Sequence, residues 1–315
     1  MESRPRVLVT GCAGMFGSEL IRCLPEGLEV FPFDHAALDL TDFGSIDRAV
    51  AEVRPHWILN AAAYTDVDGA ESKSELAFAV NGAGVGALAR AASKSESSLV
   101  HISTDYVFSG EQSVAYSEDD PTAPINVYGA SKLAGEHAIA DSELAAAWIL
   151  RTSWLYGPGG KCFPGTIARL AQEEEELKVV DDQFGAPTLT TDLATLLIAL
   201  VGLDGVSTAP PGIYHATSEG KCSWYDFSVA IVDGLRERGV PLAARSIRPV
   251  KSFAFPRPAP RPHHSTLSLK KLSQALERRE EACGHSPAAV PRPWREALSS
   301  YLDAETAPGP PGARG

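Results

Sequence analysis

Short apolar runs alternate along the first half of the chain with longer stretches whose apolar residues recur at helical spacing. The runs are rich in β-branched residues and predict strands at residues 7–9, 30–33, 57–59, 99–102, 148–150 and 178–180. Between them we expect helices over residues 45–53, 71–94 and 126–141. Strands that alternate with helices are typical of parallel sheets with right-handed crossovers. The pattern therefore predicts an α/β fold, a Rossmann-like doubly wound parallel sheet.

The alternation becomes irregular after residue 151, which indicates a second, smaller unit. This part contains the turn sequence Gly157-Pro158-Gly159-Gly160 and a proline-rich stretch over residues 249–262. We assign residues 1–151 to a nucleotide-binding Rossmann domain, to which a later segment at roughly 185–218 returns. Residues 152–302 are assigned mainly to a C-terminal substrate-binding domain. Residues 303–315, which end in proline, glycine and alanine, are expected to form a disordered tail.

The charge balance narrows the class of partner. The chain has 315 residues with 28 lysines and arginines against 40 acidic residues, a formal net charge of −12, which argues against a nucleic-acid-binding protein. The longest strongly apolar stretch, residues 193–203, is far shorter than the roughly 20 residues that cross a bilayer, so no membrane span is expected. The five cysteines include no C-x-x-C pair and the eight histidines show no zinc-ligand spacing. We therefore expect a cytoplasmic protein with reduced thiols and no structural metal.

The first predicted strand leads directly into a glycine-rich loop that opens the first helix. The loop reads Gly11-Cys12-Ala13-Gly14-Met15-Phe16-Gly17. Glycines permit a tight turn and a close backbone approach, and the helix N-terminus offers free N–H groups and its positive dipole end to a pyrophosphate. Strand, glycine turn and helix in this order predict a dinucleotide-binding site, with a merely structural turn as the alternative.

An acidic residue follows at the end of the second strand. Asp34 lies beyond Gly11 at a spacing close to the roughly 20 residues at which an acid binds the adenosine ribose hydroxyl groups. Its charge repels a 2′-phosphate and so favours NADH, while the neighbouring His35 softens this discrimination. The alternative is that Asp34 only caps a turn.

Two side chains at helical spacing carry candidate chemistry. In Tyr128-Gly129-Ala130-Ser131-Lys132 a helix places Tyr128 and Lys132 on one face. A tyrosine with an ordinary pKa near 10 is protonated at neutral pH and can donate to a carbonyl oxygen as hydride arrives at the carbon. The ammonium of Lys132 would stabilise the phenolate that results. Chance matches to this spacing are common, and the prediction gains its weight from the glycine loop.

Polar residues also follow the strand predicted at residues 99–102. The sequence continues Ser103-Thr104-Asp105-Tyr106-Val107-Phe108, so these residues lie at the carboxyl end of a parallel strand, where such sheets bind their ligands. Thr104 can hydrogen-bond and polarise the reacting carbonyl oxygen, and Asp105 can bind a sugar hydroxyl or assist proton transfer. The alternative for both is capping of the strand end.

With these motifs in place, the chain resembles the extended short-chain dehydrogenase/reductases, and most closely the dTDP-4-dehydrorhamnose reductase family. The resemblance covers nearly the whole chain up to Tyr301. Besides the motifs above, it rests on Asn60-Ala61-Ala62-Ala63-Tyr64-Thr65-Asp66-Val67-Asp68, Pro124-Ile125-Asn126-Val127, Arg151-Thr152-Ser153-Trp154-Leu155-Tyr156-Gly157, Asp181-Asp182-Gln183-Phe184-Gly185-Ala186-Pro187-Thr188 and Arg261-Pro262.

The resemblance implies an activity and a set of site residues. It implies that NADPH or NADH reduces the C4 ketone of dTDP-4-dehydro-β-L-rhamnose to dTDP-β-L-rhamnose, with Tyr128 as the proton donor. It implies that the cofactor site is lined by Gly11, Met15, Phe16, Asp34, Asp39, Leu40, Ala61, Ala62, Ala63 and Thr65. It also implies that the sugar meets Thr104, Asp105, Tyr128 and Trp154.

Two further features of the residues themselves bear on the substrate. Trp154 ends a predicted strand before a glycine-rich loop, and its flat apolar ring suits a deoxysugar, with core packing as the alternative. Five cations without an intervening acid, Arg245, Arg248, Lys251, Arg257 and Arg261, form a candidate diphosphate site. Of these, Arg261 is the predicted substrate ligand, and an exposed polyproline-like segment is the alternative.

The sequence departs from the family pattern at two points. Cys162-Phe163 stands where relatives commonly have Asn-Phe, and the glutamates with which some relatives hold a magnesium ion between two subunits have no match here. No metal is therefore predicted, and a homodimer stays open.

The sequence leaves two other functions open. The alternatives to the reductase are a 4-ketoreductase for another dTDP-4-keto-6-deoxysugar and a non-catalytic subunit resembling the one that binds methionine adenosyltransferase.

Overall fold

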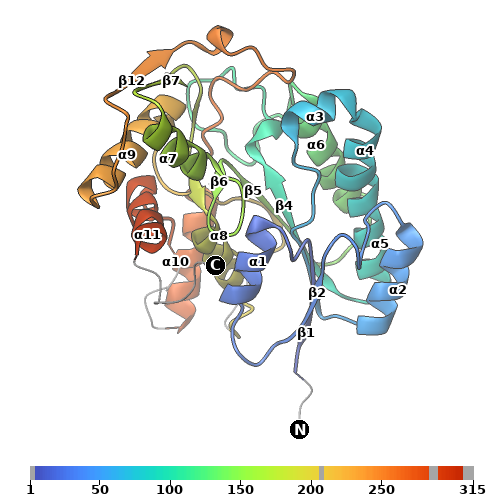
Figure 1. Ribbon diagram of the computed structural model, residues 1–315. Helices are drawn as coiled ribbons and strands as arrows, with labels where there is room; N and C mark the ends of the chain where they lie inside the picture. Colours follow the sequence, from blue (N-terminus) through green and yellow to red (C-terminus); the bar gives the residue numbers. More distant parts are fainter. Residues whose placement is uncertain (1–3, 206–208, 284–289, 308–315) are drawn as a thin grey trace.

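A six-stranded parallel sheet forms the centre of the protein. The computed structural model describes residues 4–205, 209–283 and 290–307 (Figure 1). The strand order is β10-β5-β4-β3-β1-β2, and every neighbouring pair is parallel. The strands are β1 (Arg6–Thr10), β2 (Glu29–Phe33), β3 (Trp57–Asn60), β4 (Ser98–Thr104), β5 (Ala147–Thr152) and β10 (Gly212–His215). The predicted Rossmann-like doubly wound fold is confirmed.

Helices cover both faces of this sheet because its strands are apolar on both sides (Figure 1). Along β1, Val7 and Val9 belong to the core cluster that also contains residues of α1 (Met15–Cys23), α8 (Thr190–Val201) and α10 (Lys270–Cys283). Leu8 points the other way, into the layer of α2 (Phe43–Val53) and α5 (Val85–Lys94). Helix α6 (Val127–Ala140) packs beside α5 on this second face. Strand β2 lies on one side of β1, whereas β3, β4 and β5 follow on the other side, so the order of the strands reverses at β1. Such a reversal leaves a crevice at the carboxyl ends of β1 and β3.

The helix predicted over residues 71–94 is wrong as a single element. The chain instead forms α3 (Val67–Ser72), α4 (Ser74–Phe78), a π-helical turn η1 (Ala79–Gly84) and then α5. The π-helical turn directs Asn81 inward, where its amide bonds both the N–H and the carbonyl group of Tyr64 and donates to the hydroxyl of Ser131. The wider turn thereby fastens the loop after β3 to helix α6.

The remaining elements form a second, smaller core. It contains α7 (Phe163–Glu173), α9 (Trp224–Glu237) and α11 (Trp294–Thr306), packed around buried residues such as Phe227 and Ile231. Strands β7 (Glu176–Val180) and β12 (Ser246–Val250) pair with each other, so the strand predicted at 178–180 lies outside the central sheet. Two more short pairs complete this part: β6 (Leu155–Tyr156) with β9 (Thr188–Leu189), and β8 (Phe184–Gly185) with β11 (Cys222–Ser223). Two 3-10 turns, η2 (Asp105–Val107) and η3 (Ser252–Ala254), also belong to the fold.

The later segment predicted at roughly 185–218 contains α8 and β10. Helix α8 packs on the central sheet and β10 extends it, whereas the domain boundaries themselves stay a prediction. The disordered tail predicted from residue 303 is wrong at its start. Helix α11 continues to Thr306, whose hydroxyl group donates to the carbonyl of the buried Leu302, and residues 308–315 lie outside the described part. Within the described residues, no helix is long and apolar enough to cross a membrane.

Candidate active site

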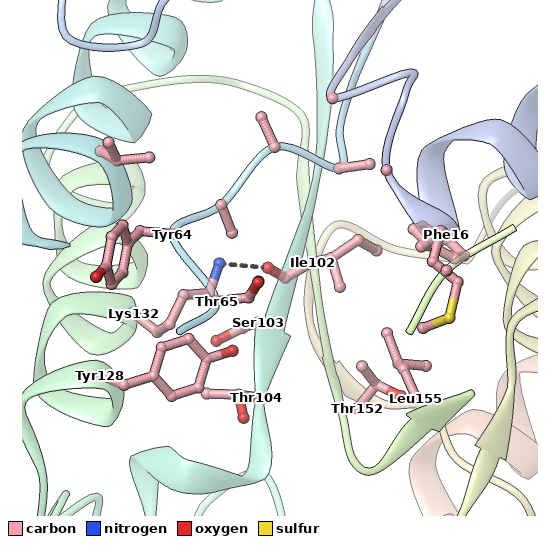
Figure 2. A pocket seen from close by; sticks show the side chains of 18 of the residues that line it. Phe16, Tyr64, Thr65, Ile102, Ser103, Thr104, Tyr128, Lys132, Thr152 and Leu155 are labelled. Carbon is pink, nitrogen blue, oxygen red and sulfur yellow. Dashed lines mark hydrogen bonds between the residues drawn. The ribbon is translucent and has the colours of Figure 1, made fainter. Parts of the chain in front are cut away.

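A cavity of about 960 Å³ lies at the carboxyl ends of the central strands, between them and the C-terminal part (Figure 2). Sixteen residues predicted from the sequence line it: Gly11, Gly14, Met15, Phe16, Asp34, Asp39, Leu40, Ala61, Ala62, Ala63, Thr65, Thr104, Asp105, Tyr128, Lys132 and Trp154. They come from six segments that are far apart in sequence, five of them at strand ends and one in helix α6. The topology of the sheet brings them together.

The glycine loop fits a pyrophosphate. Gly11 adopts a φ of +68°, and a Cβ there would lie 2.7 Å from the backbone of Ala62. Gly14 is the N-cap of α1 and has no side chain to occupy the first N–H groups of the helix. Gly17 does not line the cavity; a Cβ on it would overlap the carbonyl oxygen of Gly11. Gly17 therefore allows helix α1 to pack directly on the turn that the other two glycines form.

The acids predicted for the adenosine end lie on the loop after β2. Asp34 lines the cavity, where a ribose ligand has to lie, and its side chain accepts the N–H of Ala37 at 2.8 Å, as the turn-capping alternative predicts. Asp39 accepts the N–H and the hydroxyl of Thr41, each at 2.8 Å, and the first of these bonds is the main reason that its pKa lies below the usual value. These carboxylates are therefore fixed in place before any cofactor binds.

Helix α6 presents Tyr128 and Lys132 to the cavity (Figure 2). Its start is set by Asn126, whose side chain accepts the N–H of Gly129 at 2.7 Å. A Cβ at Gly129 would overlap the carbonyl oxygen of Tyr106, so glycine lets the helix rest on the chain that follows β4. Burial raises the pKa of Tyr128 to about 12, and a hydrogen bond with Thr104 partly offsets this. Tyr128 thus keeps its proton at any physiological pH.

Thr104 ends β4 and Asp105 follows it, and both lie close to Tyr128. The Thr104 hydroxyl donates to Asp105 Oδ1 at 3.1 Å and accepts the N–H of Tyr106 at 3.2 Å, so the capping alternative also holds. Asp105 is 2% exposed. Burial raises its pKa to about 7, with hydrogen bonds from Ser265 and Thr104 opposing the shift. A carboxyl group with this pKa exchanges protons near neutral pH.

The raised pKa of Asp105 predicts a pH-dependent effect of Asp105→Asn on stability. Between about pH 4 and pH 7 the folded protein keeps a proton that the unfolded chain releases, so stability falls as pH rises. The amide removes this loss. We expect urea unfolding at about pH 8 to show a stabilisation on the order of 1–4 kcal/mol, and little difference near pH 4. An equal difference at both pH values would contradict a buried, neutralised Asp105.

Trp154 lines the cavity together with Trp224, a residue that the sequence analysis did not identify. The Trp154 ring stacks on the Trp224 ring, with the centroids 3.4 Å apart and an angle of 7° between the ring planes. The backbone of Trp154 has a φ of +47°, and a Cβ at Gly185 would come within 2.6 Å of its indole. The glycine of the Asp-Gln-Phe-Gly-Ala-Pro-Thr segment therefore makes room for the tryptophan. Trp224 begins α9, seventy positions later, and nothing local in the sequence signals its stacking.

Known proteins are similar to this chain over most of its length. Residues 5–307 match the family described as RmlD substrate binding domain. The chain is 43% identical over 302 residues to the dTDP-4-dehydrorhamnose reductase of Streptomyces griseus, covering 96% of this chain and 94% of that protein. It is 42% identical to the enzyme of that name from Escherichia coli K12, covering 85% and 91%. The chain belongs to the dTDP-4-dehydrorhamnose reductase family.

Solved structures agree with this assignment. The dTDP-4-dehydrorhamnose reductase of Bacillus anthracis in complex with NADP is similar with a TM-score of 0.84 and 35% identity, covering 96% of this chain and 99% of that one. The orthologue from Clostridium acetobutylicum has a TM-score of 0.83 at 35% identity, with coverage of 95% and 99%. The family therefore includes a member that binds NADP in this fold.

Arg261, which the sequence predicts as a substrate ligand, does not line the cavity. It contacts Tyr106 and forms an ion pair with Asp68 at 2.5 Å. The other cations of its segment also have carboxylate partners: Arg245 with Glu175, Arg248 with Glu176, Lys251 with Asp181 and Arg257 with Asp68. In this reductase-family chain the basic segment thus lies against acids of the C-terminal part and of α3.

The cavity has further lining residues that the sequence did not single out. Lys161 follows the Gly157 to Gly160 turn and is the cation that this loop adds to the cavity, and Gly160 packs against Met15. The run of glycines before a lysine is the signal that would have identified it. Tyr64 and Ser103 also face the cavity (Figure 2). Among the described residues, no three histidine, cysteine or acidic side chains are grouped as a metal site would require.

Proposed function

We propose that this protein is a dTDP-4-dehydrorhamnose reductase that uses NADPH or NADH to reduce the C4 ketone of dTDP-4-dehydro-β-L-rhamnose to dTDP-β-L-rhamnose. The observation that carries the proposal is a single cavity with a glycine cradle at one end and Tyr128, Lys132 and Thr104 at the other. Its relatives over 85% or more of the chain include reductases of this name.

Each polar side chain near Tyr128 supports a separate role in the reduction. The bound cofactor supplies the hydride. Tyr128 donates its proton to the sugar's C4 oxygen, and the Thr104 hydroxyl hydrogen-bonds the same oxygen and keeps it in line with Tyr128. Lys132 stabilises the negative charge that forms on Tyr128 and holds the ribose next to the nicotinamide. Asp105, beside Thr104, binds a sugar hydroxyl group or assists the proton transfer.

The cofactor residues fit either nicotinamide nucleotide. Gly11, Gly14 and the N-terminus of α1 would hold the pyrophosphate, while Asp34 would bind the adenosine ribose. Asp34 disfavours a 2′-phosphate, yet the Bacillus anthracis relative, at 35% identity, binds NADP. His35 and Lys161 line the same cavity and bring cationic or hydrogen-bonding groups to it. We therefore expect turnover with both cofactors.

Trp154 is proposed to hold the sugar ring against its stacked pair with Trp224. An aromatic contact of this kind is worth about 0.5–1.5 kcal/mol. Trp154→Ala should therefore raise the KM for the dTDP-sugar roughly two- to tenfold while the dissociation constant for NADPH stays unchanged. Steady-state kinetics and fluorescence titration measure the two quantities. A rise confined to the NADPH constant would place Trp154 at the wrong end of the cavity.

Arg261 remains a proposed ligand of the diphosphate. Because Asp68 holds its guanidinium at 2.5 Å, binding there has to displace that carboxylate. The cytoplasmic location also stays a prediction. Whether the protein forms a homodimer stays open.

The test is oxidation of NADPH and of NADH by the purified protein with dTDP-4-dehydro-L-rhamnose generated in situ, with the product identified by mass spectrometry and NMR. Turnover to dTDP-L-rhamnose is the expected result and ranks the two cofactors. Turnover only with another dTDP-4-keto-6-deoxysugar would favour the natural-product ketoreductase. Cofactor binding without any turnover would favour the non-catalytic subunit.

A further inference from the structure

A buried chain of hydrogen bonds runs from the central sheet to Lys132. Lys132 Nζ lies 2.7 Å from the carbonyl oxygen of Ile102 and 3.3 Å from His101 Nε2 (Figure 2 shows the first bond). On the other side of the imidazole ring, His101 Nδ1 lies 2.8 Å from Asn60 Nδ2. His101 has no exposed surface, so no substrate or cofactor touches it. Whatever it contributes to the reaction passes through Lys132.

The neighbours of Asn60 fix which way its amide points. Asn60 Oδ1 accepts the hydroxyl of Thr10 at 2.6 Å and the N–H of Ala62 at 3.2 Å. A backbone N–H can only donate, so the oxygen must face Ala62 and the amide nitrogen must face His101. Asn60 Nδ2 therefore donates to His101 Nδ1. The neutral ring then carries its proton on Nε2, which points at the nitrogen of Lys132.

This arrangement places a donor in front of Lys132. An ammonium group can only donate, and two donors cannot share a hydrogen bond. A neutral amine can accept the Nε2–H through its lone pair and still donate to the carbonyl of Ile102. We propose that Asn60 and His101 are positioning residues, which hold the nitrogen of Lys132 on the cavity wall that it shares with Tyr128 and, in the free protein, destabilise its ammonium relative to its amine.

The groups around Lys132 agree with this arrangement. Burial lowers the pKa of Lys132 to about 8, and Glu136 on the same helix partly opposes the shift. Glu136 is itself bound by Arg151 of β5 at 2.6 Å and by Ser103 of β4. The pKa of His101 lies well below its usual value because of burial and of Lys132, so the ring stays neutral.

Other elements around Lys132 contribute little charge. Tyr128 on α6 and Asp105 after β4 share the cavity wall with it, and both are neutral below about pH 7. From α3, α4, η1 and α5, which pack on α6, no side chain in the described part contributes to the shift in its pKa. Among the described side chains, that of His101 is therefore the one within hydrogen-bond distance of the lysine nitrogen.

The consequence for catalysis rests on the proposed function. The ammonium of Lys132 stabilises a Tyr128 phenolate, so activity should fall as pH rises through the pKa of Lys132. A change that removes the opposing donor raises this pKa and moves the alkaline fall to higher pH. A role of His101 in packing alone would leave the position of that fall unchanged.

The tautomer is measured directly by ¹⁵N NMR on the free protein labelled in histidine, with the His101 signals identified by their loss in His101→Gln. We expect a protonated Nε2 and an unprotonated Nδ1 across about pH 6 to 9. A proton on Nδ1 overturns the proposal. This measurement needs no turnover, so it stands whether or not the proposed substrate is correct.

The effect on Lys132 is measured by the pH dependence of kcat/KM in a matched pair of variants. His101→Gln keeps an acceptor toward Asn60 and an N–H toward Lys132, whereas His101→Leu removes both. We expect the alkaline limb to move up by about one pH unit in the leucine variant and to stay in place in the glutamine variant. Equal limbs in all three proteins overturn the proposal, whereas a wild type without turnover counts against the proposed function.

Asn60→Asp provides a second route if His101→Leu does not fold. A carboxylate accepts the N–H of Ala62 and the hydroxyl of Thr10 as the amide oxygen does, but it needs an N–H from His101 Nδ1. The ring should then switch its proton to Nδ1 in the NMR spectrum, and the alkaline limb should rise as in the leucine variant. A ring that keeps its proton on Nε2 contradicts the assignment of Asn60 as the residue that sets the tautomer.

Discussion

Replacement of Tyr128 by phenylalanine is expected to lower kcat by about 10²- to 10⁴-fold, the usual contribution of a positioned general acid. The change removes one oxygen from a ring that stands edge-on to Tyr106, with centroids 5.9 Å apart, so the packing of α6 is kept. The dissociation constant for NADPH should stay within about twofold of the wild type. Stopped-flow measurement of NADPH oxidation separates the chemical step from binding.

The matched control for this prediction is Tyr64→Phe, which removes a hydroxyl from another tyrosine that lines the cavity. We expect a much smaller loss there because the Tyr64 hydroxyl lies beside Gly69 of α3, and Figure 2 shows the Tyr64 ring apart from Thr104 and Tyr128. If Tyr128→Phe turned over at the wild-type rate, the proton would come from another group and the assigned role would be wrong.

Replacement of Gly17 by alanine is expected to weaken NADPH binding about ten- to hundredfold. The added methyl group would overlap the carbonyl oxygen of Gly11, and the clash involves backbone on both sides, so helix α1 or the glycine turn has to move. Forced overpacking of this kind costs about 1–3 kcal/mol, and here the cost falls on the loop that would hold the pyrophosphate. Fluorescence titration with NADPH measures the effect.

Gly165→Ala is the control for the glycine substitution itself. Gly165 lies in α7, where a Cβ would make only an ordinary contact, at 3.7 Å from the sulfur of Cys162. Alanine should slightly stabilise this helix and leave NADPH binding unchanged. Unchanged NADPH affinity in Gly17→Ala as well would contradict the placement of the pyrophosphate on this loop.

Much of the fold follows from local features of the sequence. The first five strands lie within two residues of their predicted limits, because buried parallel strands are short, apolar and bounded by turn residues. The glycine loop and Tyr128 with Lys132 could be predicted for the same reason, since each motif is contained in a single element. Their convergence on one cavity follows from the order of the strands.

The features that could not be predicted depend on contacts between distant segments. The π-helical turn at Asn81 exists because the loop at Tyr64 needs both of its backbone groups bonded. The stacking of Trp154 on Trp224 joins a strand end to the start of a helix in another part of the chain. The acids opposite the basic segment come from α3, from near the start of β7 and from the end of β7, which no count of local charge reveals.

Reduction with NADPH deuterated at the transferred position tests the central claim most directly. The purified protein is incubated with this cofactor and with dTDP-4-dehydro-L-rhamnose generated in situ, and NMR of the product locates the deuterium. We predict deuterium at C4 of dTDP-L-rhamnose in the wild type and its near absence in Tyr128→Phe over the same time. Deuterium at another carbon, or none in the wild type with NADPH bound, would contradict the assignment of this cavity as a C4 ketoreductase site.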